Sequence, residues 1–244
     1  MNDYKSGIFQ MFFHRYLTLL LKRNFYHIYI EDLRRNKTSK GIYMFNHSSW
    51  WDGLLVFYLN YTYLKEDAYA FMSEDGLSKF PFFKKLGAFP VNSHSYKSVV
   101  KALQFGVDRI KEGKTVFIFP QGKEEHLEKR PLQFMSGLSY MIEKTPNVKI
   151  IPVTFYYTFR HDQKPELFIR IGEEWDETEE VVDRKGLTYK LEQLMEHEID
   201  QVKNVIIQED VKHYTSLVRG RLTVSEWMTV LKNRSIGVEN NGFS

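Results

Sequence analysis

His47 and Asp52 are the two residues of this chain whose types and spacing are best suited to catalysis. They stand five positions apart, directly after a strand-like apolar run at residues 41–45. At this spacing a carboxylate can hold one imidazole nitrogen and leave the other free to take a proton, as in a general base with its orienting acid. The sequence has no Gly-x-Ser-x-Gly stretch that would supply a serine nucleophile. We therefore expect the nucleophile to belong to a substrate.

Three further segments follow these two residues in a defined order. A Phe-Pro pair opens residues 80–91, a second Phe-Pro pair opens residues 119–122, and Ile-Pro-Val occupies residues 151–153. In order and spacing, these segments and residues 46–52 resemble the blocks of the glycerolipid acyltransferase family, which includes bacterial 1-acylglycerol-3-phosphate acyltransferases. The resemblance extends over residues 41–154.

The resemblance implies transfer of a fatty acyl group from a thioester, acyl-CoA or acyl-carrier protein, to a hydroxyl of a lysophospholipid or 1-acylglycerol-3-phosphate. His47 would be the general base and Asp52 its orienter, with no acyl-enzyme, no metal and no cofactor beyond the acyl donor as co-substrate. The resemblance also assigns five residues to substrate binding: Asn46, Gln121, Gly122, Lys123 and Arg130.

The chain departs from the family pattern where an anionic acceptor would bind. Gln121 stands in place of the usual Glu, and Lys123-Glu124 stands in place of Thr-Arg. The place of the family's phosphate-binding arginine, counted from Gly87, holds Ser93. An anionic acceptor therefore loses two expected cationic partners.

Two hypotheses about the acceptor follow from these departures, and a third concerns catalysis itself. Lys123, Lys129 and Arg130 could replace the missing cations, because lysine binds phosphate as a point charge. Alternatively, the acceptor carries no phosphate and is a glycolipid or a glycosylated isoprenoid. The third hypothesis is a lipid-binding module of the same fold without turnover, which the intact His47 and Asp52 disfavour.

The composition excludes several other classes of function. The 244 residues include no cysteine, so disulfides, thiolate catalysis and Cys-based zinc sites are excluded. The formal net charge of +3 suits a membrane surface with anionic headgroups and is too small to indicate a nucleic-acid partner.

The N-terminal segment, residues 1–26, is expected to form an amphipathic helix. Its apolar residues recur at helical spacing, and Lys22 and Arg23 lie near its end. His14 and Arg15 interrupt the apolar run, which fits neither a secretory signal nor a membrane span. The helix either docks on its own domain or lies in the membrane interface. We expect a peripheral protein at the cytoplasmic face of the membrane.

The elements that must position His47 follow from the alternation of apolar runs. Strands are predicted at residues 27–30, 41–45, 68–72, 115–119, 150–157 and 166–172, and helices at 52–59, 96–111 and 135–144. Residues 80–83 are predicted to be an exposed-looking apolar loop that either packs on the domain or touches the membrane. The region after the acidic run that begins at 173 is predicted to be mostly helical to about 233.

This pattern predicts an α/β fold, with a largely parallel sheet flanked by helices. We expect the acyltransferase domain to span residues 27–235 and a frayed tail to span 236–244. Sites in such sheets gather beyond the carboxyl ends of strands, so the segments that carry His47 and Gly122 are expected to line one cleft.

Overall fold

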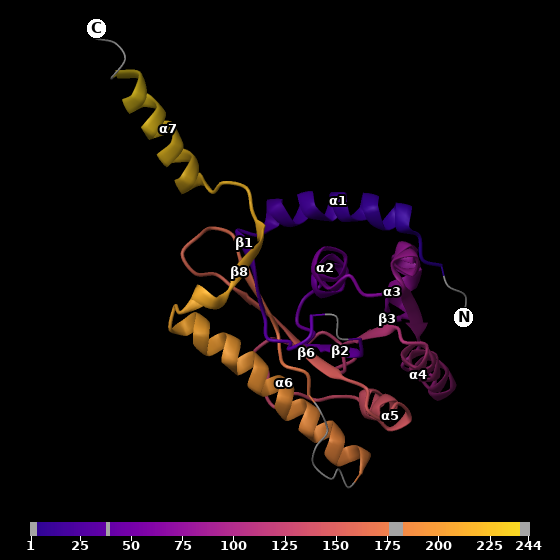
Figure 1. Ribbon diagram of the computed structural model, residues 1–244. Helices are drawn as coiled ribbons and strands as arrows, with labels where there is room; N and C mark the ends of the chain where they lie inside the picture. The colour runs from indigo at the N-terminus through magenta and orange to yellow at the C-terminus, as the bar shows by residue number, and fades with distance from the viewer. Residues whose placement is uncertain (1–3, 38–39, 176–182, 240–244) are drawn as a thin grey trace.

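The computed structural model describes residues 4–37, 40–175 and 183–239, and one eight-stranded sheet forms its centre (Figure 1). The strands lie side by side in the order β4 (Ala88–Val91), β3 (Ala68–Ser73), β5 (Thr115–Ile118), β2 (Ile42–Phe45), β6 (Ile150–Thr158), β7 (Glu166–Ile171), β1 (His27–Asp32) and β8 (Thr215–Arg219).

Most of the sheet is parallel. Strands β4, β3, β5, β2 and β6 run in one direction, because every neighbouring pair among them is parallel. β7 runs against β6, β1 is parallel to β7, and β8 runs against β1. The prediction of an α/β fold with a largely parallel sheet is confirmed. The carboxyl ends of β5, β2 and β6 consequently meet at one edge of the sheet.

Helices cover both faces of this sheet (Figure 1). On one face lie α1 (Gly7–Asn24) and α2 (Asp52–Leu59), and on the other lie α4 (Tyr96–Lys111), α5 (Gly137–Lys144) and α6 (Arg184–Ile207). The shorter elements are the π-helix η1 (Asn60–Leu64) that continues α2, the helix α3 (Glu74–Lys79), and the 3-10 helices η2 (Pro81–Leu86) and η3 (Val211–His213).

Strand β2 contributes to the cores on both faces of the sheet. Tyr43 and Phe45 pack into the core shared with α1 and α2, whereas Ile42 and Met44 pack into the core shared with α4, α5 and α6. All four residues are buried, as expected of a central strand in a sheet with two covered faces. His47 therefore directly follows a strand whose four residues are all buried.

The chain after residue 207 differs from the predicted helical structure. Helix α6 is followed by η3, then by β8, and then by the last helix, α7 (Val224–Glu239). Only Val218 of β8 is buried, so the strand lacks the apolar alternation that marks a strand in a sequence. Helix α7 extends past residue 235, where the frayed tail was expected to begin, and residues 240–244 lie outside the described part of the chain.

The apolar segment at residues 80–83 is partly exposed and partly packed: Phe80 and Pro81 are exposed, whereas Phe82 and Phe83 are half-buried. Most of it lies in η2, which packs against α1. The ring centroid of Phe82 is 5.1 Å from that of Phe13 and 6.3 Å from that of Phe9. Helix α1 thus covers this aromatic segment and shields part of it from solvent.

Helix α1 is docked on the domain along one side. Ser6 caps its first turn, and Leu17 and Leu21 are fully buried. The Phe13 ring also packs on Phe57 of α2, with 5.4 Å between the ring centroids. The predicted docking of this helix on its own domain is therefore present in the structure.

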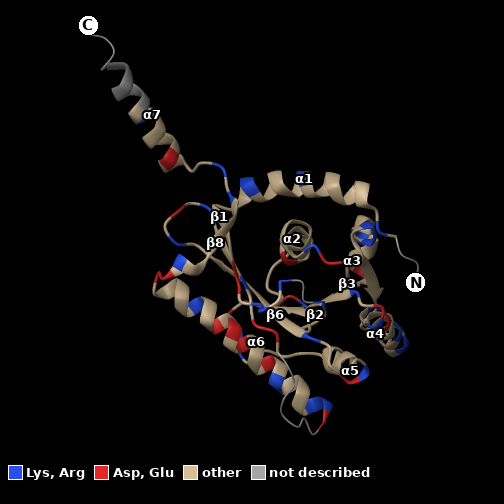
Figure 2. Ribbon diagram, in the orientation of Figure 1, with Lys and Arg blue, Asp and Glu red and all other residues tan. Residues whose placement is uncertain are grey.

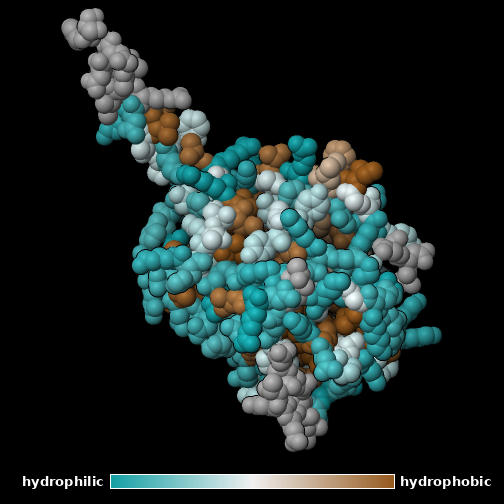
Figure 3. Space-filling view, in the orientation of Figure 1, coloured by the Kyte–Doolittle hydropathy of each residue, from teal (hydrophilic) through white to brown (hydrophobic). Residues whose placement is uncertain are grey.

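The outer side of α1 is also apolar. Ile8, Phe12 and Leu19 are exposed, and Figure 3 shows apolar side chains on the outer surface of this helix. Figure 2 shows no acidic residue along α1, and Lys22 and Arg23 lie in its last turn, where the helix dipole favours positive charge. No helix in the described part of the chain is both long and apolar enough to cross a bilayer.

Candidate active site

His47 and Asp52 meet at the carboxyl edge of the sheet. His47 follows β2 and Asp52 begins α2, and the Nδ1 of His47 lies 2.9 Å from the Oδ2 of Asp52. The imidazole is 21% exposed, whereas the carboxylate is fully buried. With Nδ1–H donated to Asp52, Nε2 is the acceptor nitrogen of the neutral ring. No described residue hydrogen-bonds to this nitrogen, so it is free to accept a proton from a bound molecule.

The Asp52 carboxylate receives donors on both oxygens. Besides His47, its Oδ2 accepts the backbone N–H groups of Ser48 at 2.7 Å and Ser49 at 2.9 Å. Its Oδ1 accepts the hydroxyl of Tyr157. The positive end of the α2 dipole also favours a negative charge at this position. These contacts hold the carboxylate in one orientation, and through it the imidazole.

Tyr157 is a site residue that sequence reasoning missed. It lies at the carboxyl end of β6, and burial together with the charge of Asp52 raises the pKa of its phenol well above its ordinary value. The phenol therefore stays protonated and remains a donor. Its ring packs against Phe25, which in turn meets the Trp51 ring edge-on at 5.2 Å between centroids. The only feature of the sequence that points to Tyr157 is its place in a Tyr-Tyr pair at the end of a predicted strand.

The loop after β5, which carries Gly122, lies against His47. The sequence predicts that these two segments lie close together. The Phe119 ring stacks on the imidazole with 4.4 Å between centroids. The side-chain oxygen of Gln121 accepts the backbone N–H of His47 at 2.7 Å. The backbone N–H of Glu125 donates to the His47 carbonyl oxygen at 2.9 Å. The loop thus fixes both the ring and the backbone of His47.

Two of the predicted substrate-binding residues, Gln121 and Gly122, help to shape this loop. Gln121 is buried, and its amide oxygen is engaged by the His47 backbone. Gly122 has a φ of +70°, in the left-handed region that favours glycine, and a Cβ there would lie 2.5 Å from the Sδ of Met135. The Gly122 N–H donates to the Phe119 carbonyl oxygen at 3.0 Å, so it is not a free donor for an oxyanion.

Lys123 and Lys129 both surround one buried carboxylate, that of Glu125. Their Nζ atoms lie 3.3 Å and 2.5 Å from its Oε1. The hydrogen bond from Lys129 is the main cause that lowers the pKa of Glu125. The Oε2 of Glu125 is buried and has no hydrogen-bond partner in the described part of the chain. The two lysines that could replace the missing family cations are therefore already paired.

The guanidinium of Arg130, another predicted substrate-binding residue, contacts other parts of the protein in this structure. Its guanidinium donates to the carbonyl oxygens of Leu127 at 3.0 Å and Lys129 at 2.9 Å, and to Asp200 of α6 at 3.0 Å. Arginine has a planar fork of donors, and here that fork ties a loop to a helix. A role of Arg130 in substrate binding stays a prediction.

Asn46, also predicted to contact substrate, is hydrogen-bonded to the backbone of β6. Its side-chain nitrogen donates to the carbonyl oxygen of Phe155 at 2.9 Å, and its side-chain oxygen accepts the N–H of Phe155 at 2.7 Å. The side chain is buried and joins the exit of β2 to β6. A contact of Asn46 with substrate stays a prediction.

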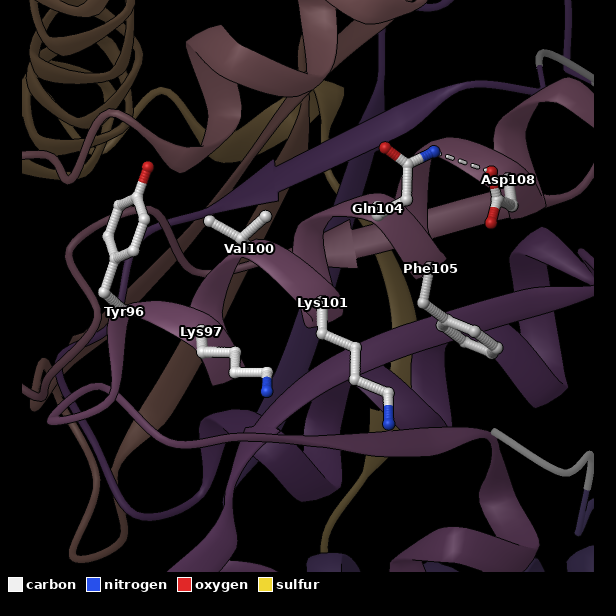
Figure 4. A pocket seen from close by; sticks show the side chains of 7 residues that line it. All are labelled: Tyr96, Lys97, Val100, Lys101, Gln104, Phe105 and Asp108. Carbon is white, nitrogen blue, oxygen red and sulfur yellow. Dashed lines mark hydrogen bonds between the residues drawn. The ribbon is translucent and has the colours of Figure 1, made fainter.

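Two other features of the described chain lie apart from this chemistry. No group of three or more His, Asp or Glu residues that could hold a metal ion occurs among the described residues. A surface hollow of about 670 Å³ is lined entirely by side chains of α4, among them Tyr96, Lys101 and Phe105 (Figure 4). Helix α4 covers the face of the sheet opposite α2, so this hollow is not the cleft of His47.

Comparisons with known proteins identify the family of this chain and agree with its fold. The model of the acyltransferase family matches residues 26–156, which is more than half of the chain. The chain therefore belongs to the acyltransferase family. A search of curated proteins found no match.

Among solved structures, the fold is similar to that of the 1-acyl-sn-glycerophosphate (LPA) acyltransferase PlsC from Thermotoga maritima. The TM-score is 0.51 and the sequence identity 18%, with 80% of this chain and 79% of that chain covered. At this identity the likeness concerns the fold. The N-terminal boundary of the family match, residue 26, falls directly after α1.

Proposed function

We propose that this protein transfers a fatty acyl group from acyl-CoA or acyl-carrier protein to a hydroxyl of a lysophospholipid or 1-acylglycerol-3-phosphate. The observation that carries the proposal is the His47–Asp52 contact of 2.9 Å, with Nε2 of His47 free and the pair at the carboxyl edge of the sheet. The similar fold of the LPA acyltransferase PlsC from Thermotoga maritima supports a lysolipid acceptor.

In the proposed reaction His47 acts as the general base. Its Nε2 takes the proton of the acceptor hydroxyl while the hydroxyl oxygen attacks the thioester carbonyl carbon. Asp52 stabilises the resulting imidazolium through Nδ1. Collapse of the tetrahedral intermediate breaks the carbon–sulfur bond, and the leaving thiolate takes the proton back from Nε2. The products are the ester and a free thiol, and His47 returns to its neutral form.

The proposal includes peripheral attachment to the cytoplasmic face of the membrane through α1. Both the acceptor and the product are lipids, so a site near a bilayer has direct access to them. The exposed Ile8, Phe12 and Leu19 on the outer side of α1 supply apolar area for the interface, and Lys22 and Arg23 suit anionic headgroups.

A second candidate function is acyl transfer to a lipid without a phosphomonoester, such as a glycolipid. The pairing of the cations near His47 favours it. Lys123 and Lys129 both contact Glu125, and Arg130 contacts Asp200. A phosphate would have to displace one of these pairs, whereas a neutral headgroup would not.

The experiment that separates these candidates is an acceptor panel with labelled acyl-CoA and acyl-carrier protein as donors. The acceptors are 1-acylglycerol-3-phosphate, a lysophosphatidylcholine and a neutral monoacyl glycolipid. Product on the first acceptor supports the primary proposal, and product on the glycolipid alone supports the second. Absence of product with every pair, despite binding to vesicles, supports the non-catalytic lipid-binding module instead.

A matched pair of variants tests whether the lysines bind phosphate. In Lys123→Gln/Lys129→Gln we expect a roughly tenfold higher KM for 1-acylglycerol-3-phosphate, because each lysine contributes a charge-assisted contact. The KM for a neutral acceptor should not change. Lys97→Gln/Lys101→Gln on α4 removes the same charge from the opposite face of the sheet and serves as the control. Equal effects on both acceptors would argue against a phosphate site here.

A further inference from the structure

Helix α7 exposes an apolar stripe that nothing in the described chain covers. Val224 lies three and four residues before Trp227 and Met228, which in turn lie four and three residues before Leu231, so the four share one side of the helix. Each of these side chains is more than half exposed. Figure 3 shows apolar side chains on α7 where it rises from the body of the molecule.

The start of α7 is fixed by capping hydrogen bonds. Thr223 and Glu226 form a capping box, in which the Thr223 N–H donates to Glu226 at 2.9 Å and the Glu226 N–H donates to the Thr223 hydroxyl at 3.4 Å. Glu226 also accepts the hydroxyl of Tyr26 at 3.4 Å, directly after α1. The helix therefore begins at a defined place on the domain.

The segment that leads into α7 is attached to the end of α1. The Gly220 N–H donates to the Tyr26 carbonyl oxygen at 2.7 Å, and the Arg221 N–H donates to the Lys22 carbonyl oxygen at 2.8 Å. A Cβ on Gly220 would lie 2.0 Å from the Phe25 carbonyl oxygen, so the two backbones touch. In Figure 1, α7 rises from the end of α1 on the side of the molecule that α1 covers. The two apolar helices thus share one side of the protein.

Three exposed cations lie where the two helices meet. Lys22, Arg23 and Arg221 are exposed, and their side chains form no ion pair within the described part of the chain. Figure 2 shows basic residues at the end of α1 that lies nearest to α7. A basic patch between two exposed apolar stripes is the charge pattern that suits an anionic bilayer surface, with cations at the headgroups and apolar side chains below them.

We propose that α7 is a second membrane-docking helix, which lies in the interface of an anionic bilayer beside α1. The proposal rests on the peripheral membrane attachment described under the proposed function and extends it to the other end of the described chain. Lys22, Arg23 and Arg221 contact lipid phosphates. The stripe formed by Val224, Trp227, Met228 and Leu231 enters the acyl region.

Single cysteine labels on the full chain test this directly, because the chain has no cysteine of its own. Met228→Cys places an environment-sensitive fluorophore on the apolar stripe, and Thr229→Cys places it on the opposite side of the same helix. Vesicles contain phosphatidylcholine with or without phosphatidylglycerol, and a second set carries nitroxide-labelled acyl chains as quencher. Sedimentation and acyl transfer are measured on the same preparations.

We expect a blue shift and nitroxide quenching at position 228 with phosphatidylglycerol vesicles, and water-like emission at position 229. Lys22→Gln/Arg23→Gln/Arg221→Gln should weaken binding to these vesicles about tenfold, with little effect on phosphatidylcholine. A circular dichroism melt confirms that each variant is folded.

Three results would overturn the proposal. In the first, the protein sediments with vesicles while position 228 stays water-like, so that α1 alone docks. In the second, the blue shift appears without vesicles and grows with protein concentration, so that a second copy of the chain covers the stripe. In the third, the protein does not bind vesicles at all. A protein that shows the expected blue shift and quenching at position 228 but transfers no acyl group would instead contradict the proposed function and leave this inference intact.

Discussion

At the scale of single residues, the site is organised around one buried carboxylate. Asp52 accepts from His47, from two backbone N–H groups and from Tyr157. Burying an ionised carboxylate is unfavourable unless donors replace its water, and here four donors do so. The arrangement fixes the imidazole tautomer and the direction of Nε2, which a solvent-exposed dyad would not achieve.

Replacement of Tyr157 by Phe tests the part of this network that lies farthest from the reaction. We expect Tyr157→Phe to lower kcat by roughly tenfold with an unchanged KM, because Asp52 loses one orienting donor while the substrate contacts stay in place. Steady-state kinetics with the best acceptor of the panel measures both parameters. An increase in KM alone would show that Tyr157 contacts the substrate instead of positioning Asp52.

The sequence predicts some of this site and not the rest, for a physical reason. The contact of His47 with Asp52 is local, because both residues lie within one strand-to-helix connection. The contact of Tyr157 with Asp52 joins residues 105 positions apart, and no spacing rule reports it. The contacts of Asn46 with Phe155 and of Arg130 with Asp200 also join residues far apart in the sequence, so the sequence alone does not predict them.

At the scale of elements, Asn46 joins two strands at the edge that carries the site. Both polar atoms of its side chain satisfy the backbone of Phe155, which is itself fully buried. A small side chain at this position therefore connects the exit of β2, and so the backbone before His47, to β6.

We expect Asn46→Ala to destabilise the protein by about 2–4 kcal/mol, because the buried N–H and C=O of Phe155 both lose their partner. Urea unfolding measures this change. Ser93→Ala is the control, because Ser93 is exposed and should alter stability by less than about 0.5 kcal/mol. A change of less than about 0.5 kcal/mol in the free energy of unfolding for Asn46→Ala would show that this residue does not stabilise the connection of β2 to β6.

A buried ion pair at the end of β1 makes stability depend on pH. Arg34 donates to Asp32 at 3.0 Å and 2.9 Å and to the hydroxyl of Tyr43 at 2.7 Å. Burial alone would raise the pKa of Asp32, but the hydrogen bonds and charge of Arg34 outweigh it and hold the pKa below its usual range. The stability from this pair is therefore complete above the ordinary aspartate pKa and is lost as the pH falls through the lower, folded value.

Asp32→Asn should cost about 3 kcal/mol at neutral pH, because it leaves the Arg34 charge buried without its partner. The difference from wild type should shrink as the pH falls below about 4. Urea unfolding across this range measures it, with the exposed Asp75→Asn as control. A difference that stays constant with pH would show that the pair does not carry the titration.

The two strands that the sequence does not predict, β4 and β8, lie at the edges of the sheet. β4 has four residues and includes Pro90, which is tolerated on an edge strand but weakens the strand signal. β8 has one buried residue, Val218. Edge strands bury little, so their sequences lack the periodicity that reveals the central strands. The helix at Tyr96–Lys111 was predicted to the residue, because its apolar face and its end signals agree.

At the scale of the whole molecule, one side carries two apolar helices and the basic patch between them. Helix α1 covers the core with its inner side and exposes apolar residues on its outer side (Figures 1 and 3). The active site lies under the same layer, because Phe25 at the end of α1 packs on Tyr157 and Trp51. A bilayer at this side would lie close to the site that uses its lipids.

Phe12→Ser/Leu19→Ser tests the membrane side. We expect about tenfold weaker sedimentation with phosphatidylglycerol vesicles and an unchanged melting temperature, because both side chains are exposed in the folded protein. Tyr96→Ser removes an exposed aromatic side chain from α4, on the opposite face of the sheet, and is the control. Equal sedimentation of all three proteins would place the contact elsewhere.

The central claim is that His47 takes the proton of the acceptor hydroxyl, and consumption of labelled thioester by wild type and His47→Ala tests it most directly. We predict that wild type forms the acylated lipid and that His47→Ala is slower by about 10³-fold or more, with the same melting temperature. Retention of the wild-type rate in a folded His47→Ala protein would contradict the account.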